Sequence, residues 1–416
     1  MTNIVIIGGG IAGLYMQNKL LKKNKFKSVI LLEKNSRLGG RVYTYNTVVN
    51  NTEYSMEAGA GRFSSNHNRL FGLIEQYNLK DKVIKLNKTV DFYPRNRNLK
   101  NSKISHFLPY DFLDEIARKI KLTDDLKDIS FKKWLSKNVS SNIMNFIVET
   151  YPYKDIFKIN TYDAIRLYKK DLNINNNFYI LNGGLSQIVY KLKNDNLSMG
   201  GIIKINTQCN DVKYNDKTKI FTIITNKKDY TTDNIVFTCQ RPDLLKFKIL
   251  SPVKHLLQSV RNANLCRFYF IFDTKKCAWF KNLKKTITDS RISYFIPIDS
   301  EKGLVMISYV DEHNARYLKR MEEKNKLEFI QFMVNECKKI FGIDDIPLPI
   351  WTKSFYWNNG VGDWKVGIDS LQVQRKIVKP INGLKLYICG ENYSRDYQCW
   401  IEGALQTADK VLNKLK

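Results

Sequence analysis

Histidine is scarce in this sequence, and its cysteines are not paired. The four histidines lie far apart, at His67, His106, His255 and His313. The cysteines are odd in number and form no C-x-x-C pair: Cys209, Cys239, Cys266, Cys277, Cys337, Cys389 and Cys399. These spacings match neither a zinc site nor a disulfide framework. We therefore expect no metal, and reduced thiols as in a cytosol-like compartment.

Long apolar runs are also missing. No stretch of about eighteen apolar residues occurs, so no membrane-spanning helix is expected. The first apolar strand pattern begins at Asn3, which leaves no room for a signal or transit peptide before it. The last residues, Asn413 to Lys416, match no peroxisomal or retention signal. These features favour a cytoplasmic protein.

Acidic residues are too few to balance the basic ones. The 68 Lys and Arg residues exceed the 40 Asp and Glu residues, which gives a net charge of +28. Such a charge favours contact with nucleic acid or another polyanion. However, the chain is also rich in the residues that AT-rich codons encode, as in some large DNA viruses, and its lysines are spread rather than clustered. Genome composition is the favoured explanation, and any polyanion contact is expected to be non-specific.

The strongest motif present is a glycine-rich turn near the start. An apolar run, Ile4–Ile7, leads into Gly8, Gly10 and Gly13, then a helical pattern and a second apolar strand that ends at Glu33. This G-x-G-x-x-G between strand and helix is typical of dinucleotide binding, with the pyrophosphate on the free N–H groups of the helix. An acid 20 residues after the last glycine suits the ribose hydroxyls. The predicted contacts of the turn are Gly8, Gly10, Ile11, Ala12 and Gly13.

A second glycine pair follows the acid. Residues 35–41 read NSRLGGR, with Gly39 and Gly40 between Arg37 and Arg41. In this R-x-G-G-R pattern the chain resembles the flavin-dependent amine oxidase superfamily, which includes monoamine, polyamine and L-amino-acid oxidases. The glycines would allow close backbone approach, and Arg41 would neutralise phosphate charge. The resemblance implies FAD, with contacts from Lys34, Arg37, Gly40 and Arg41.

The end of the chain carries a matching signature. An apolar strand ends in Gly390 and Glu391, and W-I-E-G-A, from Trp400 to Ala404, opens the last helix. By resemblance, Glu391 binds ribityl or ribose hydroxyls. The helix N-terminus at Ile401 would face the flavin pyrimidine, where its dipole favours negative charge on the reduced ring. Ala404 is a further expected contact.

One arginine indicates the substrate class. The segment Glu57–Phe63 contains Gly59, Ala60, Gly61 and Arg62. It resembles the part of L-amino-acid oxidases that passes beside the flavin and ends in the arginine that pairs with the substrate carboxylate. A planar guanidinium suits that task. The alternative is that Arg62 bonds local carbonyls or Glu57.

Other site residues are placed by resemblance alone. Arg267 occupies the position of a family lysine that holds a water against flavin N5; the alternative is that it points outward, because a shift of one residue would reverse its side of the strand. Trp364 and Trp400 match two aromatic cage positions, with core packing as the alternative. The backbone of Val212 would bracket the adenine. Covalent members have a cysteine near the turn at Gly362, and none occurs there in the sequence, which implies non-covalent FAD.

The fold class expected is α/β. Glycine is absent from Lys80 to Phe178, where Asp111–Lys121, Phe131–Lys137 and Asn142–Glu149 have helical patterns, and a long helix is expected at Arg316–Phe341. We expect a Rossmann-type, GR2-like FAD domain from residues 1–79, 178–242 and 384–416, a helical insertion at 80–177, and a mixed α+β substrate domain at 243–383.

The favoured function is an FAD-dependent oxidase of a primary amine, with an amino acid preferred. Hydride would pass from the α-carbon to flavin N5, and oxygen would reoxidise the flavin to give peroxide. One alternative is a desaturase or protoporphyrinogen-oxidase-like enzyme, although Arg62 argues against a long apolar channel. The other is a basic FAD-binding protein with little turnover, which Arg267 in place of lysine leaves open.

Overall fold

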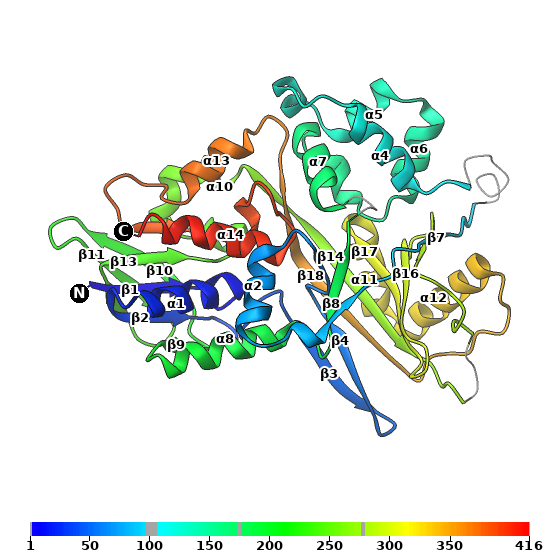
Figure 1. The fold of residues 1–416 in the computed structure, drawn as a ribbon, viewed down its shortest axis with the longest axis horizontal. Coiled ribbons are helices and arrows are strands. Elements are labelled where there is room, and N and C mark those ends of the chain that lie inside the picture. The colour runs from blue at the N-terminus through cyan, green and yellow to red at the C-terminus, as the bar shows by residue number, and fades with distance from the viewer. Residues whose placement is uncertain (1, 97–105, 173–175, 276–278, 416) are drawn as a thin grey trace.

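The computed structural model describes residues 2–96, 106–172, 176–275 and 279–415. Its first sheet is parallel, with the strand order β19-β13-β1-β2-β9 (Figure 1). The strands are β1 (Thr2–Ile7), β2 (Phe26–Leu32), β9 (Ile202–Lys204), β13 (Asn234–Phe237) and β19 (Leu386–Ile388). The start, middle and end of the chain thus meet in one sheet. Strand β1 is buried between its neighbours, which explains its continuous apolar run.

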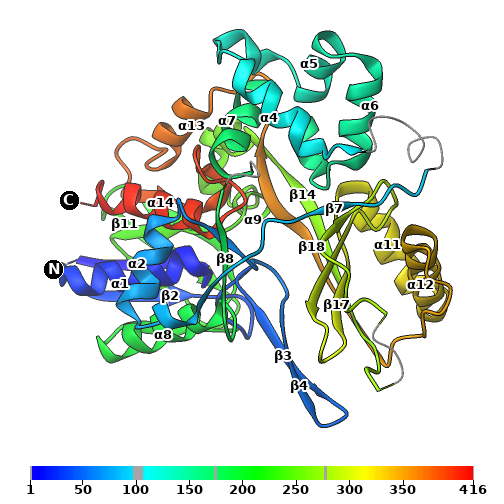
Figure 2. The same cartoon turned by 45° about the vertical axis from the view of Figure 1, so that its right-hand side comes forward.

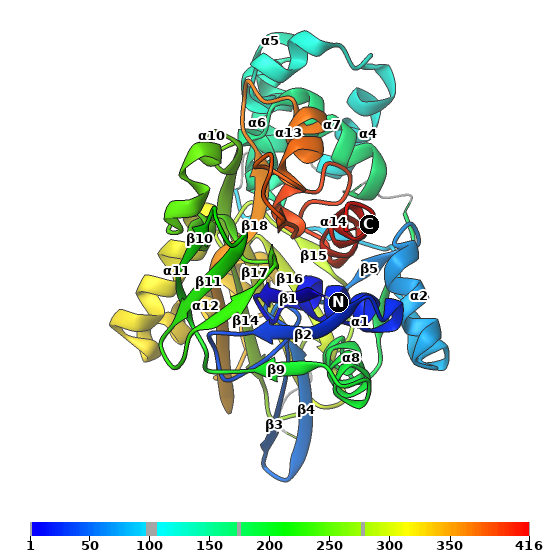
Figure 3. The ribbon, with the colours of Figure 1, turned by 90° about the vertical axis from the view of Figure 1, so that its left-hand side faces the viewer.

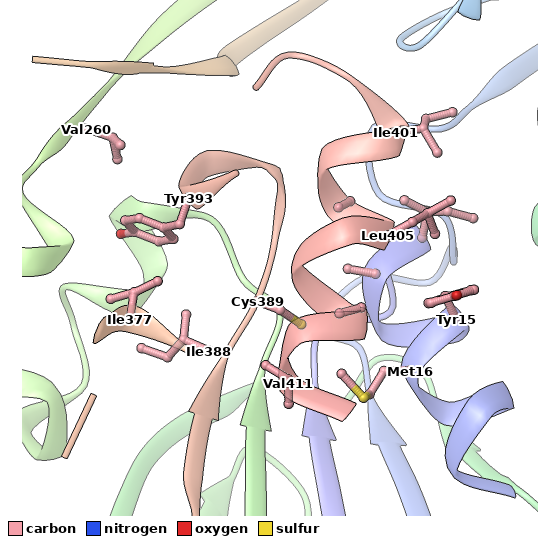
Figure 4. Packing of buried hydrophobic residues seen from close by; sticks show 14 of the residues in the cluster. Tyr15, Met16, Val260, Ile377, Ile388, Cys389, Tyr393, Ile401, Leu405 and Val411 are labelled. Atoms are coloured by element: carbon pink, nitrogen blue, oxygen red, sulfur yellow. The ribbon is translucent and has the colours of Figure 1, made fainter. Parts of the chain in front are cut away.

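Helices cover one face of this sheet, and a small antiparallel sheet covers the other (Figure 3). The helices are α1 (Ile11–Lys23), α8 (Ser186–Ser198) and α14 (Ile401–Leu412); the small sheet is β10 (Cys209–Asn215), β11 (Ile220–Thr225) and β12 (Tyr230–Thr232). Figure 4 shows Leu405 of α14 on the side of the helix that faces α1, where Tyr15 and Met16 lie. Because these side chains are buried, the last helix is fixed onto the first.

A six-stranded sheet forms the second half of the molecule, in the order β18-β14-β17-β16-β15-β7. Its strands are β7 (Asp91–Phe92), β14 (Val260–Ile271), β15 (Thr286–Ile287), β16 (Tyr294–Asp299), β17 (Leu304–Asp311) and β18 (Trp351–Trp364). The long strand β14 lies between β17 and β18, which places Arg267 opposite Tyr309 and Phe355.

Two helices, α11 (Glu312–Lys324) and α12 (Lys326–Phe341), cover the outer face of this sheet (Figure 2). The sequence predicted one continuous helix here, which is wrong. The break falls at Asn325, whose side chain accepts hydrogen bonds from the N–H groups of Leu327 and Glu328 and so caps α12. The buried Phe329 of α12 packs on Phe268, with the ring centroids 5.0 Å apart.

The helices expected between residues 80 and 177 are present from Pro109 onward. They are α4 (Pro109–Lys119), α5 (Phe131–Asn138), α6 (Ser141–Thr150) and α7 (Thr161–Leu167). Ser130, Ser140 and Asn160 cap the last three through their side chains. The segment before them is extended: β6 (Val83–Lys85) pairs with β8 (Phe178–Leu181), and β7 joins the six-stranded sheet.

The remaining elements connect the two halves. The hairpin of β3 (Thr44–Val49) and β4 (Thr52–Glu57) projects between the sheets (Figure 1). The others are β5 (Phe63–Ser64), α2 (Asn68–Gln76), α9 (Arg241–Leu244), α10 (Lys254–Leu257) and α13 (Ser370–Ile377). None of the helices in the described segments is long and apolar enough to cross a membrane.

Candidate functional site

A cavity of about 1180 Å³ runs from the ends of the parallel strands to the six-stranded sheet. Four strands of the first sheet each deliver a lining residue within two positions of their ends: Gly8, Glu33, Thr238 and Gly390. Ligands of open α/β sheets bind at this carboxyl edge. The opposite end of the cavity is lined by Arg62, Arg267 and the phenol rings of the substrate-side strands.

The glycine turn has the geometry that a pyrophosphate requires. A Cβ placed on Gly10 would meet no described atom within 4 Å and would project into the cavity. A Cβ on Gly13 would lie 2.0 Å from the carbonyl oxygen of Gly8, so the helix could not pack so closely with any larger residue. Gly8 has a φ of +114°, a left-handed conformation that glycine adopts freely. The first turn of α1 contains no acidic residue, and Ile11 and Ala12 line the cavity. These residues fit a dinucleotide phosphate.

The second glycine pair lies against the first. The N–H of Gly39 donates to the carbonyl of Gly9 at 2.8 Å, and a Cβ on Gly40 would lie 3.3 Å from Cα of Gly10. Arg37 is held beside them, because its guanidinium donates to the carbonyls of Leu38 and Gly40. The two motifs therefore form one wall of the cavity.

Glu33, the predicted ribose contact, lines the cavity after β2. Its carboxylate is buried, and it accepts hydrogen bonds from the N–H groups of Gly9, at 2.7 Å, and Asn35, at 2.8 Å. Lys34 also lines the cavity and lies 2.8 Å from Asp243. The adenine contact expected from the backbone of Val212 stays a prediction: as far as the structure describes the lining, it contains Thr207 to Asn210 but not Val212, whose buried side chain lies on β10. The residues that line the cavity here are the end of the connection before β10 and the first two residues of that strand.

The Glu391 carboxylate joins three segments of the chain at the cavity wall. Its Oε2 lies 2.8 Å from Nη1 of Arg41, and its Oε1 accepts from the N–H groups of Gly362 and Cys399, at 2.9 and 3.0 Å. Arg41 also donates to the carbonyl of Gly360. The phosphate role expected for Arg41 stays a prediction, since its guanidinium contacts Glu391 and the Gly360 carbonyl. Beyond Cys399, Trp400 is the N-cap of α14, and Ile401 and Ala404 face the cavity.

The guanidinium of Arg62 lines the cavity beside aromatic rings. Its Nη2 donates to the hydroxyl of Tyr153 at 2.7 Å, and its guanidinium lies 4.3 Å from the ring centroid of Phe178 and 5.9 Å from that of Trp400. It forms no ion pair with a carboxylate in the described part of the chain. The guanidinium is not bonded to Glu57 or a local carbonyl, which was the alternative. Gly59, Ala60 and Gly61 line the cavity before it.

Arg267 faces the cavity, so the outward alternative is wrong. Its Nη1 donates to the carbonyl of Glu57 at 2.8 Å, and its guanidinium lies over the ring of Tyr309, 4.9 Å from the centroid. Gly61 allows this position, because a Cβ there would be 2.7 Å from Nη1. The hydroxyl of Tyr269 donates to the same Glu57 carbonyl.

Of the two tryptophans, the structure places only Trp400 in the cavity. Trp364 is fully buried and is not part of the lining that the described residues form. Asp363 faces the cavity, and because side chains alternate along a strand, Trp364 points to the opposite face. Trp357, which the sequence reading missed, lines the cavity and donates its indole N–H to the carbonyl of Ala58 at 2.6 Å.

Further lining groups were not predicted from the sequence. Tyr153, Tyr294 and Tyr309 form an aromatic wall near Arg62. Burial and the neighbouring Arg62 lower the pKa of Lys285 to about 8. Burial raises the pKa of the Glu57 carboxyl to about 7, although Leu185 N–H and Thr44 stabilise the charged form. No local motif distinguishes these residues: Tyr294 and Tyr309 come from β16 and β17, whereas Tyr153 lies between α6 and the helical turn at Lys154–Lys158.

Comparisons with known proteins agree with this geometry. Residues 11–411 match the model of the flavin-containing amine oxidoreductase family. Achacin from Lissachatina fulica is 35% identical over 81 residues, which is 19% of this chain and only 15% of achacin. A solved structure described as a candidate protoporphyrinogen oxidase from Exiguobacterium sp. 255-15 is 17% identical, covers 100% of this chain and 98% of its own, and superposes with a TM-score of 0.73; at this identity the likeness shows the fold. Because the family model spans nearly the whole chain, the protein belongs to the flavin-containing amine oxidoreductase family.

Proposed function

We propose that the protein is an FAD-dependent oxidase of a primary amine, with an α-amino acid as its substrate class. The observation that supports this most directly is Arg62, a cation in the cavity whose contacts in the described part of the chain are one phenol and aromatic rings. Taking an arginine out of water is costly unless an anion meets it. A substrate carboxylate would supply that anion in bidentate geometry.

The cofactor would lie along the lining already described. Gly10, Ile11, Ala12 and Gly40 would hold the pyrophosphate, Glu33 a ribose, and the N-terminus of α14 at Ile401 the flavin ring. Bound FAD would accept the hydride equivalent from the α-carbon and return the electrons to oxygen, giving hydrogen peroxide.

The chain's own groups would supply position and charge. Arg62 would fix the carboxylate, and Phe178 and Trp400, which stack with 6.0 Å between centroids, would confine the substrate beside it. Arg267 would hold a permanent positive charge in the cavity, since its guanidinium is anchored on the Glu57 carbonyl. A reducing, cytosol-like location remains part of the proposal.

Whether FAD is covalently bound needs its own test. The expectation of non-covalent FAD rested on the lack of a cysteine near Gly362 in the sequence, but Sγ of Cys399 lies 3.8 Å from the Gly362 carbonyl oxygen and lines the cavity. We retain non-covalent binding, because the linking cysteine is expected at the Gly362 turn itself. Cys399 belongs to a different segment, which is joined to that turn through Glu391. Acid precipitation should release all flavin; flavin that stays with wild-type protein but not with Cys399→Ala would establish a thiol link instead.

Anaerobic flavin bleaching tests the reaction. Wild-type protein should be bleached by one or more amino acids in a panel that also contains polyamines and aromatic amines. Arg62→Ala should weaken reduction by the amino acid by about 2–5 kcal/mol, and that by the decarboxylated amine far less. Equal losses would show that Arg62 does not recognise a carboxylate. Bleaching only by an apolar carbon–carbon substrate would favour the desaturase class, and no bleaching by any compound would favour a flavoprotein with little turnover.

A further inference from the structure

Three groups from distant segments converge on one point of the cavity wall. A carboxylate oxygen of Asp155, one of Asp363 and the sulfur of Cys399 all lie within 4.8 Å of one another. The Glu391 carboxylate explains this meeting, because its Oε1 accepts from both the N–H of Gly362, next to Asp363, and the N–H of Cys399. All three side chains line the same cavity as Arg62.

The carboxyl oxygens of Asp363 lack hydrogen-bond donors among the described residues. Asp363 is fully buried, and neither of its oxygens has an aligned hydrogen bond from any described residue; Oδ2 lies 2.8 Å from Nη2 of Arg261. Arg261 is shared, because its Nη1 lies 2.5 Å from Glu312. Asp311 adds another carboxylate behind Asp155, whose N–H it accepts at 3.0 Å. Burial and the neighbouring Asp155 carboxylate accordingly raise the pKa of Asp363 well above its usual range, although Arg261 opposes this.

We propose that Asp155 and Asp363, with the sulfur of Cys399 beside them, form a subsite for an ammonium group of the substrate. Because the three atoms lie within 4.8 Å of one another, a nitrogen placed in the plane between them is no farther than about 2.8 Å from each, which is the length of a charge-assisted N–H···O bond. Zinc ligands approach to roughly 2.0–2.3 Å, and the Zn²⁺ titration described below tests a metal at this point against an ammonium group. Three acceptors also match the three N–H donors of an ammonium group.

This inference rests on the proposed function and sharpens it. Asp155 follows Tyr153 by two positions in one short segment, and Tyr153 accepts the hydrogen bond of Arg62. A cationic arginine and a pair of carboxyl groups thereby line one cavity, connected through the segment from Tyr153 to Asp155. This arrangement is complementary to a zwitterion, which carries an anionic and a cationic group on one carbon.

Matched ligands separate the two charges. Calorimetric titration of the FAD-loaded protein would use L-phenylalanine, L-3-phenyllactate, which lacks the ammonium group, and 2-phenylethylamine, which lacks the carboxylate. Asp363→Asn should weaken phenylalanine and phenylethylamine binding by on the order of 10- to 100-fold and leave phenyllactate within about twofold. Asp155→Asn should act in the same direction and provides the test if Asp363→Asn does not fold. Asp311→Asn is the control, since it changes the same buried carboxyl cluster but is not part of the described lining.

The outcomes distinguish this subsite from the proposed function. If phenylethylamine binds Asp363→Asn and Asp155→Asn as tightly as wild type, the ammonium subsite is refuted, whatever the amino-acid turnover. If phenylethylamine binding depends on Asp363 but phenyllactate binding is unchanged in Arg62→Ala, the subsite stands and the amino-acid assignment fails. A parallel titration with Zn²⁺ alone provides a further check: tight binding that Cys399→Ser abolishes would make the cluster a metal site and overturn the proposal.

Discussion

Nη1 of Arg41 lies 2.8 Å from Oε2 of Glu391, so one ion pair joins the first and the last signature of the chain. The Glu391 side chain is 5% exposed, whereas that of Arg41 is 26% exposed. Since the same carboxylate holds the backbone of Gly362 and Cys399, this pair fixes the relative position of the cofactor end and the substrate end.

Removing the cation should therefore destabilise the fold. Arg41→Met leaves a buried carboxylate without its counter-charge, which should cost about 3 kcal/mol or more in the free energy of unfolding. Urea unfolding followed by circular dichroism measures this. Lys34→Met is the matched control, because the Lys34–Asp243 pair also borders the cavity but is more exposed, and surface pairs contribute less than about 1 kcal/mol. Equal losses in the free energy of unfolding for both variants would contradict the role given to the Arg41–Glu391 pair.

Two glycine variants separate cofactor binding from folding. Gly10 has a φ of −71°, which alanine adopts, so Gly10→Ala should cost only the weaker N-cap preference of alanine, about 1 kcal/mol, but place a methyl group in the phosphate cradle. FAD affinity should fall at least about tenfold. Gly13→Ala should instead destabilise the protein by roughly 1–3 kcal/mol or more, because its Cβ would overlap the Gly8 carbonyl. Flavin fluorescence titration and thermal unfolding give the two readouts.

Gly72→Ala serves as the control for this series. It too would meet no described atom within 4 Å, but it lies on the exposed face of α2 away from the cavity. It should retain full FAD affinity. Loss of FAD binding in Gly72→Ala as well as Gly10→Ala would mean that the effect of Gly10→Ala is not local.

The sequence predicted best what is decided within a few neighbouring residues. The turns at Gly8–Gly13 and Gly39–Gly40 depend on local backbone conformation and close approach, and the structure places both at the cavity. The end signature behaves the same way, since a helix N-terminus follows directly from Trp400 to Ala404. Even so, how these separated turns meet was inferred from resemblance rather than from the residues.

The sequence predicted poorly what depends on strand register. The pairing of β14 with β18 shifts between Ala263 and Leu265, so counting along the strand could not decide whether Trp357 or Trp364 faces the cavity. Asn325 was missed for a different reason: the helical pattern of apolar residues continues across it, and only its role as a cap shows the break.

Glu57 should make stability depend on pH. Its pKa, about 7 in the folded protein because of burial, exceeds the ordinary value of 4.5. The folded state thus holds the proton more tightly, and stability from this group is greatest below about pH 4.5 and falls by up to about 3 kcal/mol as pH rises to 7. Glu57→Gln keeps the shape without the charge, so its unfolding temperature should exceed that of wild type at pH 8 and match it at pH 4.5. Glu53→Gln, on the exposed side of the same hairpin, controls for losing a carboxylate; a constant difference between Glu57→Gln and wild type across this range would refute the prediction.

Arg267 should govern electron transfer to oxygen more than reduction by the substrate. Its guanidinium faces the cavity and is fixed to the Glu57 carbonyl, so its positive charge is already oriented when negative charge develops on oxygen. Arg267→Met keeps most of the side-chain volume but removes the charge. Anaerobic reduction should stay near the wild-type rate, while reoxidation by air slows about tenfold or more. Stopped-flow absorbance measures both half-reactions on the same sample.

The conservative variant decides whether charge or packing is responsible. Arg267→Lys restores the cation that the family resemblance places here, so it should reoxidise at least as fast as wild type, even though lysine cannot reproduce the contact over the Tyr309 ring. Tyr309→Phe keeps that ring and the charge, and should leave reoxidation unchanged. If Arg267→Met and Arg267→Lys slow reoxidation equally, the guanidinium acts by holding the cavity wall in place rather than by its charge. If neither variant changes the rate, oxygen does not receive its electrons near Arg267, and an acceptor other than oxygen becomes the better hypothesis.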